Sequence, residues 1–260
     1  MLGHLTPRRG VLEHVAPYRT VLVEAALFVA GVLAYFLTRG VTEAGYPLAA
    51  ANADRLVGAE RALGLAVEAW VQGLVLPHHA LVTLANWVYI YGHWPVIGLA
   101  AGWLAWRRPD TYRWLRTAML VSGLIGVVVF VAYPVAPPRL MPDLGIADTV
   151  TQHSSAYRVL QPPSFVNQYA ALPSLHVGWD LLVGLALLRA GTVRAVRVLA
   201  VAAPVAMALA VVLTGNHYLV DVAAGAAVAA VGALVATWWQ RRTRPAAPAR
   251  LATRELVTAR

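Results

Sequence analysis

Residues 194–240 read RAVRVLAVAAPVAMALAVVLTGNHYLVDVAAGAAVAAVGALVATWWQ, two apolar runs separated by the polar segment 215–221. A helix needs roughly 20 apolar residues to cross the hydrocarbon core of a bilayer, so the runs predict transmembrane helices over 194–214 and 217–240. Successive spans cross in opposite directions, and the polar segment between them therefore lies at one membrane surface.

Four further apolar stretches precede this pair, at 20–38, 79–106, 114–134 and 175–190. The chain is 59% hydrophobic and 13% charged, with a mean hydropathy of +0.62, whereas a soluble domain carries about 25% charged residues. We therefore predict an all-α fold, an integral membrane bundle of six transmembrane helices in one domain over 1–240. The first stretch is interpreted as a retained signal anchor.

Two segments are not predicted to span. Residues 41–76 place acidic residues among spaced apolar ones, which indicates an interfacial amphipathic segment between the first two spans, although a plain helical loop fits as well. Residues 241–260 are rich in Arg, Ala and Pro without periodicity, and predict a disordered cytoplasmic tail held near anionic headgroups.

The arginines predict the orientation. All 21 basic residues are Arg, and 16 of them fall on one side of the membrane when both termini are placed in the cytoplasm. We expect a multi-pass plasma-membrane protein whose polar clusters are extracytoplasmic. The net charge of +9 is scattered between apolar spans, which favours a membrane partner over nucleic acid, and the absence of cysteine excludes thiolate chemistry and cysteine zinc sites.

Three polar clusters fall on the predicted outer side: 137–139 after the third span, 173–176 at the start of the fourth, and 215–221 before the sixth. The first two border a 40-residue connection, 134–173, that contains seven prolines. Loops of this length are often lids or binding segments.

In the third cluster His217 and Asp221 are four residues apart and share one helix face. The carboxylate can fix the imidazole tautomer and leave the other ring nitrogen free to attack. A purely structural His–Asp pair is equally compatible with this spacing.

In the second cluster Pro173 suits the first turn of a helix, which directs the amides of 174–176 outward as an anion site. His176 is placed to give a proton to a leaving oxygen, or is only an interfacial residue. In the first cluster Arg139 offers a planar fork suited to phosphate, or a salt bridge with Asp143 or Asp148.

Together the clusters hold the parts that phosphoryl transfer needs, which are positioning, charge neutralisation and leaving-group protonation, without a metal cluster. Polar groups within the second span, including Tyr89 and His93, either face the same cavity or pack between helices.

These motifs resemble the type 2 phosphatidic acid phosphatase superfamily, and within it the inositol phosphorylceramide synthase-like branch, over roughly residues 50–235. The residues that carry the resemblance are 86–93, 136–139, 167–179 and 214–221. It implies that His217 forms a phosphohistidine, that Asp221 orients it and that His176 protonates the leaving alcohol. Arg139 and the backbone near Ser174 would hold the phosphate oxygens, without a cofactor, at the non-cytoplasmic face.

The sequence departs from the broad family at two cations. A Lys seven residues before the Arg is Ala132 here, and an Arg six residues before the His is Val211. Arg158 is a candidate replacement for one of them, and the polar residues Thr214, Asn216 and Tyr218 are further candidates to contribute. Tyr169, in the long loop, is a candidate supporting residue. Asp180, four residues after His176, is expected either to pair with His176 or to satisfy a neighbouring polar group.

The sequence therefore predicts a membrane-embedded, metal-independent lipid phosphotransferase or phosphatase. Its expected partners are a phospholipid or isoprenoid-phosphate substrate and a possible hydroxyl acceptor. The alternatives are a transporter or channel, and a catalytically inactive lipid-binding relative.

Overall fold

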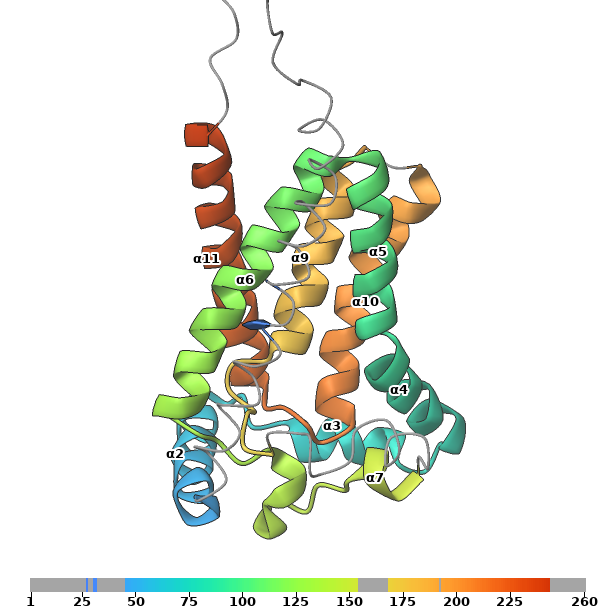
Figure 1. The fold of residues 1–260 in the computed structure, drawn as a ribbon. Coiled ribbons are helices and arrows are strands. Elements are labelled where there is room, and N and C mark those ends of the chain that lie inside the picture. Colours follow the sequence, from blue (N-terminus) through green and yellow to red (C-terminus); the bar gives the residue numbers. More distant parts are fainter. Residues whose placement is uncertain (1–26, 28–29, 32–44, 154–167, 192, 244–260) are drawn as a thin grey trace, which may run out of the picture.

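The computed structural model describes residues 27, 30–31, 45–153, 168–191 and 193–243 (Figure 1). Within these ranges the chain forms helices and no strand, apart from one isolated bridge between Val135 and Ala170. The all-α prediction is therefore confirmed. Some of the predicted features lie outside the described residues: most of the stretch 20–38, Arg158, Asn167 and the tail beyond 243. The helices are α2 (Tyr46–Leu63), α3 (Glu68–Val75), α4 (His79–Tyr91), α5 (Trp94–Arg107), α6 (Pro109–Ala132), α7 (Thr149–His153), α9 (Leu175–Arg189), α10 (Arg194–Leu213) and α11 (Leu219–Thr243), with short 3-10 turns at Pro138–Leu140 and Pro142–Leu144.

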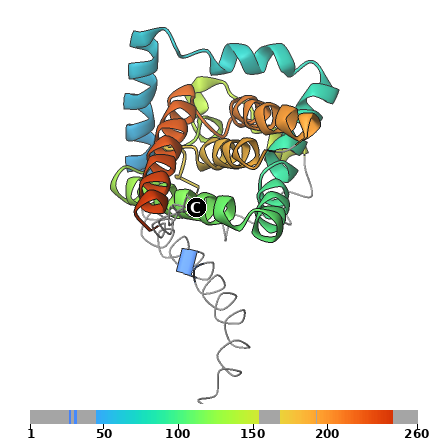
Figure 2. The same ribbon diagram turned by 90° about the horizontal axis from the view of Figure 1, so that it is seen from above.

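The long helices form a bundle in which α9 is surrounded by α5, α6, α10 and α11, as the view down the bundle shows (Figure 2). Its apolar core includes Leu104 from α5, Trp114 from α6, Leu182 from α9 and Ala236 from α11, all fully or almost fully buried. The indole of Trp114 also donates a hydrogen bond to the hydroxyl of Thr237 at 2.9 Å, which joins α6 to α11.

Three helices in the described ranges are long and apolar enough to cross a membrane: α6, α10 and α11. Large apolar side chains such as Leu124, Leu209 and Leu234 point outward from them and are more than half exposed. Burying such a surface in lipid avoids exposing it to water, so the membrane assignment is supported. The six-span topology remains a prediction.

The predicted second span, 79–106, is two helices rather than one. Helix α4 ends at Tyr91, and α5 begins at Trp94 with Pro95 in its first turn. Proline has no amide hydrogen to continue the helical ladder, which explains a break at this position. As a result His93, at the break, is turned into the protein and is 3% exposed.

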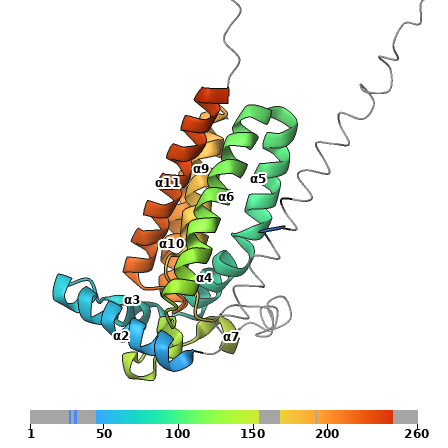
Figure 3. The same ribbon diagram turned by 60° about the vertical axis from the view of Figure 1, so that its left-hand side comes forward.

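Helices α2 and α3 lie across the end of the bundle where α10 ends and α11 begins (Figures 1 and 3). The buried side chain of Gln72 on α3 fixes this arrangement, because its amide nitrogen donates to the carbonyls of Leu213 and Ala147 at 3.0 and 2.9 Å. Its amide oxygen accepts from the backbone nitrogen of Ala147 at 2.8 Å. The segment 41–76 thus contains two helices, and their position in the membrane interface remains a prediction.

Candidate active site

The three polar clusters meet at the end of the bundle near α2 and α3. Backbone hydrogen bonds join them directly: Arg139 donates to the carbonyl of Gly215 at 2.9 Å, and Ser174 donates to the carbonyl of Asp221 at 3.0 Å. The relative positions of the clusters are therefore set by main-chain contacts and not only by side chains.

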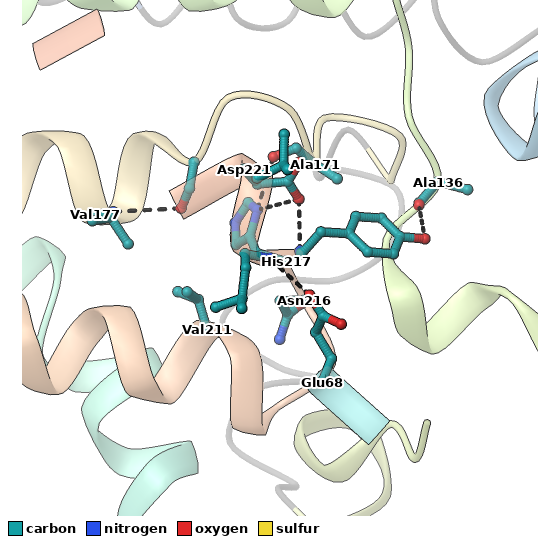
Figure 4. A network of polar contacts seen from close by, with 12 residues as sticks. Glu68, Ala136, Ala171, Val177, Val211, Asn216, His217 and Asp221 are labelled. Carbon is teal, nitrogen blue, oxygen red and sulfur yellow. Dashed lines mark hydrogen bonds and ion pairs between the residues drawn. The ribbon is translucent and has the colours of Figure 1, made fainter. Parts of the chain in front are cut away.

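His217 is 5% exposed and lies between two oxygen atoms (Figure 4). Its Nδ1 is 2.8 Å from the carbonyl oxygen of Ala171 and 3.3 Å from Oδ2 of Asp221. A carbonyl only accepts, so Nδ1 carries the hydrogen and Nε2 keeps its lone pair. The predicted His–Asp contact is present, and the carbonyl of Ala171 is an additional contact that the sequence did not indicate.

Asp221 is fully buried in the first turn of α11. Besides facing His217, its Oδ2 accepts a hydrogen bond from the amide of Tyr218 at 2.9 Å. The carboxylate therefore caps the helix and orients the imidazole with the same oxygen, at the positive end of the helix dipole.

The ring of His176 lies among three other rings. Its centroid is 4.8 Å from that of Tyr89, 4.4 Å from that of His93 and 6.0 Å from that of His217. Tyr89 and His93 of the predicted second span therefore contact a histidine of the second cluster. The two histidines of the motifs are close enough to contact one phosphoryl group.

Asp180 pairs with His93, not with His176. Its Oδ1 is 2.9 Å from Nδ1 of His93, and both side chains are at least 95% buried. The break between α4 and α5 brings His93 to Asp180, while the ring of His176 packs against Tyr89 instead. Of the two expectations for Asp180, a neighbouring polar partner is the one that the structure shows.

Arg139 is held in place by two neighbours. Its Nη1 donates to Oδ1 of Asn216 at 2.8 Å, and its Nε lies 3.5 Å from Oδ2 of Asp148. Asn216 in turn donates to the hydroxyl of Thr214 at 2.8 Å. The salt bridge to Asp148 is thus present, and Asn216 positions the guanidinium. Arg158 lies outside the described ranges.

Ser174 caps α9. Its hydroxyl accepts from the amide of Val177 at 3.5 Å, and its own amide is engaged by the carbonyl of Asp221. The first intrahelical bond of α9 runs from Gly178 to the carbonyl of Ser174. The amides of Leu175 and His176 precede that bond, so they are the ones available to an anion.

Of the two candidate tyrosines, Tyr218 packs against the first cluster. The hydroxyl of Tyr218 donates to the carbonyl of Ala136 at 3.1 Å, and the side chain is 1% exposed. The ring of Tyr169 lies 6.0 Å from that of Tyr46. Tyr218 therefore connects the first and third clusters and is not positioned as a phosphate ligand.

Two buried glutamates were not identified as site residues from the sequence. Glu60 on α2 accepts from the amide of Val220 at 2.8 Å, and Glu68 on α3 accepts from the amide of Leu219 at 2.9 Å. Glu60 falls on the buried face of α2, with the same helical spacing as the apolar residues of that face. That periodicity is the signal that would have singled it out.

The backbones of α9 and α11 are in direct contact where the two helices cross. A Cβ atom added to Gly225 would lie 2.2 Å from the carbonyl oxygen of Ser174, and one added to Gly178 would lie 2.7 Å from the carbonyl oxygen of Gly225. Small residues of this kind allow helix backbones to approach closely in membranes.

Replacing Gly225 by alanine is expected to destabilise the protein by about 1–3 kcal/mol, because the new methyl group must push backbone apart. Thermal unfolding in detergent measures this change. Gly98→Ala in α5 is the matched control, since a Cβ there meets nothing within 4 Å. Equal unfolding midpoints for the two variants would show that the crossing tolerates a side chain.

A family model described as the PAP2 superfamily matches residues 54–235, which run from α2 into α11 and include all three clusters. No significant match was found among curated proteins or among solved structures.

Proposed function

The chain belongs to the PAP2 superfamily, and on that premise we propose that it is a membrane-embedded lipid phosphotransferase or phosphatase that acts through a phosphohistidine. Its substrate is a lipid-linked phosphate ester, either a phospholipid or an isoprenoid phosphate. The observation that carries the proposal is the setting of His217, whose Nδ1 is engaged by Ala171 and Asp221 while His176 lies 6.0 Å away, ring to ring.

In the first step Nε2 of His217 attacks phosphorus, and the bond from phosphorus to the lipid oxygen breaks. His176 gives its proton to that oxygen, so a neutral alcohol leaves and the phosphoryl group stays on His217. The carboxylate of Asp221 stabilises the positive charge that develops on the attacking imidazole. The proposed chemistry is metal-independent, because nucleophile, acid and anion-binding groups are all protein groups.

The anion-binding groups are the guanidinium of Arg139 and the amides of Leu175 and His176. Arg139 is pre-oriented by Asn216 and Asp148. Val211, which stands where the broad family has an arginine, is buried in an apolar cluster. Arg158 remains our candidate for the missing cation.

In the second step the phosphohistidine transfers its phosphoryl group to water or to an acceptor hydroxyl, and His176 takes up the proton of that nucleophile. Water gives hydrolysis, and an alcohol gives head-group transfer. We place the chain in the inositol phosphorylceramide synthase-like branch, because the two broad-family cations are missing here and that branch is similarly altered.

We further propose that both termini are cytoplasmic and that the site faces the extracytoplasmic side of the plasma membrane. The ends of α5 and α11 far from the site carry tryptophans with stacked arginines: Arg107 lies 4.1 Å from the ring centroid of Trp106, and Arg242 lies 4.6 Å from that of Trp238 (Figure 1). Tryptophan marks membrane interfaces, and arginine marks the cytoplasmic side. At the other end, the exposed Trp70 on α3 supports an interfacial position for that helix.

The test is to incubate the purified protein with phosphatidate, polyprenyl diphosphate and phosphatidylinositol, each with and without alcohol acceptors. Release of free phosphate from phosphatidate or polyprenyl diphosphate, or of inositol phosphate from phosphatidylinositol, identifies a phosphatase. A new phosphoester of the acceptor identifies a transferase. Substrate flux into liposomes that survives His217→Ala would identify a transporter instead. Binding of all three lipids without turnover would identify an inactive relative.

Asp221→Asn is expected to lower kcat by about 10²-fold, the range for losing one electrostatic stabiliser of the transition state. The loss stays below the about 10⁴-fold expected where a carboxylate alone fixes the imidazole tautomer, because the carbonyl of Ala171 still accepts from His217. Steady-state turnover on the best lipid substrate measures it. A loss as large as that of a His217 variant would show that Ala171 does not hold the tautomer.

A further inference from the structure

The first turn of α11 is held by carboxylates from two other helices. Glu60 of α2 accepts from the amide of Val220, and Glu68 of α3 accepts from the amide of Leu219, at 2.8 and 2.9 Å. Glu60 is 0% exposed and Glu68 is 5% exposed. These amides have no partner within their own helix, and carboxylates at a helix N-terminus are favourable.

Asp221 supplies a third carboxylate to the same turn by accepting from the amide of Tyr218. Three consecutive amides, 218–220, thus each donate to an acidic side chain. Three negative charges packed together away from water repel one another, and a shared proton relieves that repulsion.

The position of the shared proton is indicated by Oε2 of Glu60, the carboxylate oxygen that does not accept from Val220. Oε2 of Glu60 is buried and finds no hydrogen-bond donor among the residues that the structure describes. As a carboxylate oxygen it is unsatisfied, whereas as a carboxylic acid it can donate to the carboxylate of Glu68. Burial raises the pKa of Glu60 to about 7, the amide of Val220 opposes this rise, and the neighbouring carboxylates of Glu68 and Asp221 add to it.

We propose that Glu60 and Glu68 share one proton and act together as positioning residues, holding the first turn of α11 so that His217 and Asp221 stay aligned. The inference rests on the proposed function for its catalytic consequence, but the shared proton itself does not. Neither glutamate contacts the reacting atoms in this assignment. They act through the backbone of α11, one to two residues beyond Tyr218.

A cavity of about 120 Å³ lies beside the pair. Its lining includes both glutamates, Tyr218, and the charged groups Arg61 and Asp143. A space of this size admits water. Asp221 faces the pair from α11, and the charged groups of the cavity face it from α2 and from the loop after α6.

The pair predicts a pH dependence whose sign follows from the raised pKa of Glu60. The folded state holds the proton up to about pH 7, whereas an unfolded glutamate loses it near 4.5. The stabilisation is therefore complete at low pH and is lost as the pH rises through about 7. Above that pH the two carboxylates repel, the first turn of α11 loosens, and kcat falls while KM is little changed.

Glutamine variants test this directly in the full-length protein reconstituted in nanodiscs. In Glu60→Gln the amide oxygen still accepts from Val220, and the NH₂ group replaces the shared proton. We expect it to keep kcat within about threefold at pH 6 and to remove the decline of kcat near pH 7. Glu68→Gln behaves likewise. The double variant opposes two NH₂ groups, and we expect a loss of kcat of at least about tenfold at both pH values.

Thermal unfolding between pH 5 and 8 separates this proposal from the proposed function, because it needs no substrate. The wild-type midpoint should fall across that range, and that of Glu60→Gln should not. Asp54→Asn, an exposed acid on the same helix, is the control and should follow the wild type. Parallel pH profiles for Glu60→Gln and the wild type, or a double variant no worse than either single variant, would overturn the shared proton even if turnover is present.

Discussion

Replacing His217 by glutamine is expected to abolish the phosphorylated protein and to lower kcat by at least about 10³-fold, because the nucleophile itself is lost. Glutamine is of similar size and polar, so the carbonyl of Ala171 and the carboxylate of Asp221 can still be satisfied. The fold should therefore survive, with a thermal midpoint near that of the wild type. The measurement combines turnover with acid-labile, base-stable labelling of the protein from a radiolabelled phosphate donor.

The matched control for this variant is His79→Gln. His79 begins α4 and is exposed, and its Nδ1 lies 3.5 Å from the hydroxyl of Thr83 in the next turn. It should be labelled like the wild type. Normal labelling of the His217 variant would move the nucleophile to another residue and remove the basis of the mechanism.

His176→Gln is expected to show an effect that depends on the leaving group. For a lipid alcohol, which leaves poorly without a proton, kcat should fall by about 10³-fold. For p-nitrophenyl phosphate the first turnover should stay within about tenfold of the wild type, because nitrophenolate leaves unaided. The second step still lacks its base, so phosphoprotein should accumulate.

A burst of nitrophenolate measures that first turnover, and phosphoprotein is quantified at its end. Equal losses for both leaving groups would assign His176 to phosphate binding or packing, not to acid catalysis. His78→Gln, an exposed histidine at the start of α4, is the control.

The parts of this architecture that follow from local pattern were predictable from the sequence. Hydropathy alone located α6, α10 and α11, because a helix in lipid needs an unbroken apolar run. The meeting of His176, His217 and Arg139 at one end of the bundle followed from alternating helix directions. His217 and Asp221 are neighbours because four residues make about one turn.

The parts that depend on how helices are rotated against each other were not predictable. Asp180 pairs with His93, which is 87 residues away in the sequence, because His93 lies at the break between α4 and α5 and its side chain is buried there. The carbonyl of Ala171 that holds His217 is a backbone group, which leaves no mark in the sequence. Gly92, His93 and Pro95 are the signals in the sequence that could have located the break between α4 and α5.

The contacts of Glu60 and Glu68 with the first turn of α11 could not be predicted from the sequence either, because they join residues far apart in the chain. Glu60 and Glu68 are 160 and 151 residues from the amides they bind. Within α2 the helical period places Glu60 among Ala49, Ala53 and Leu56 on the buried face. An acid on an otherwise apolar face requires a partner, but periodicity cannot say which one.

The close contact of Gly225 with Ser174 means that the spacing of the two imidazoles and the recognition of a substrate depend on different residues. The backbone of α11 packs directly against the backbone at the start of α9, and this contact sets the spacing between the imidazoles of His176 and His217. The side chains around the phosphate therefore do not have to maintain that spacing. On the proposed function, substitutions among the side chains around the phosphate can therefore change which head group is accepted without altering that spacing. A scaffold of this kind can diversify its substrates while its chemistry stays fixed.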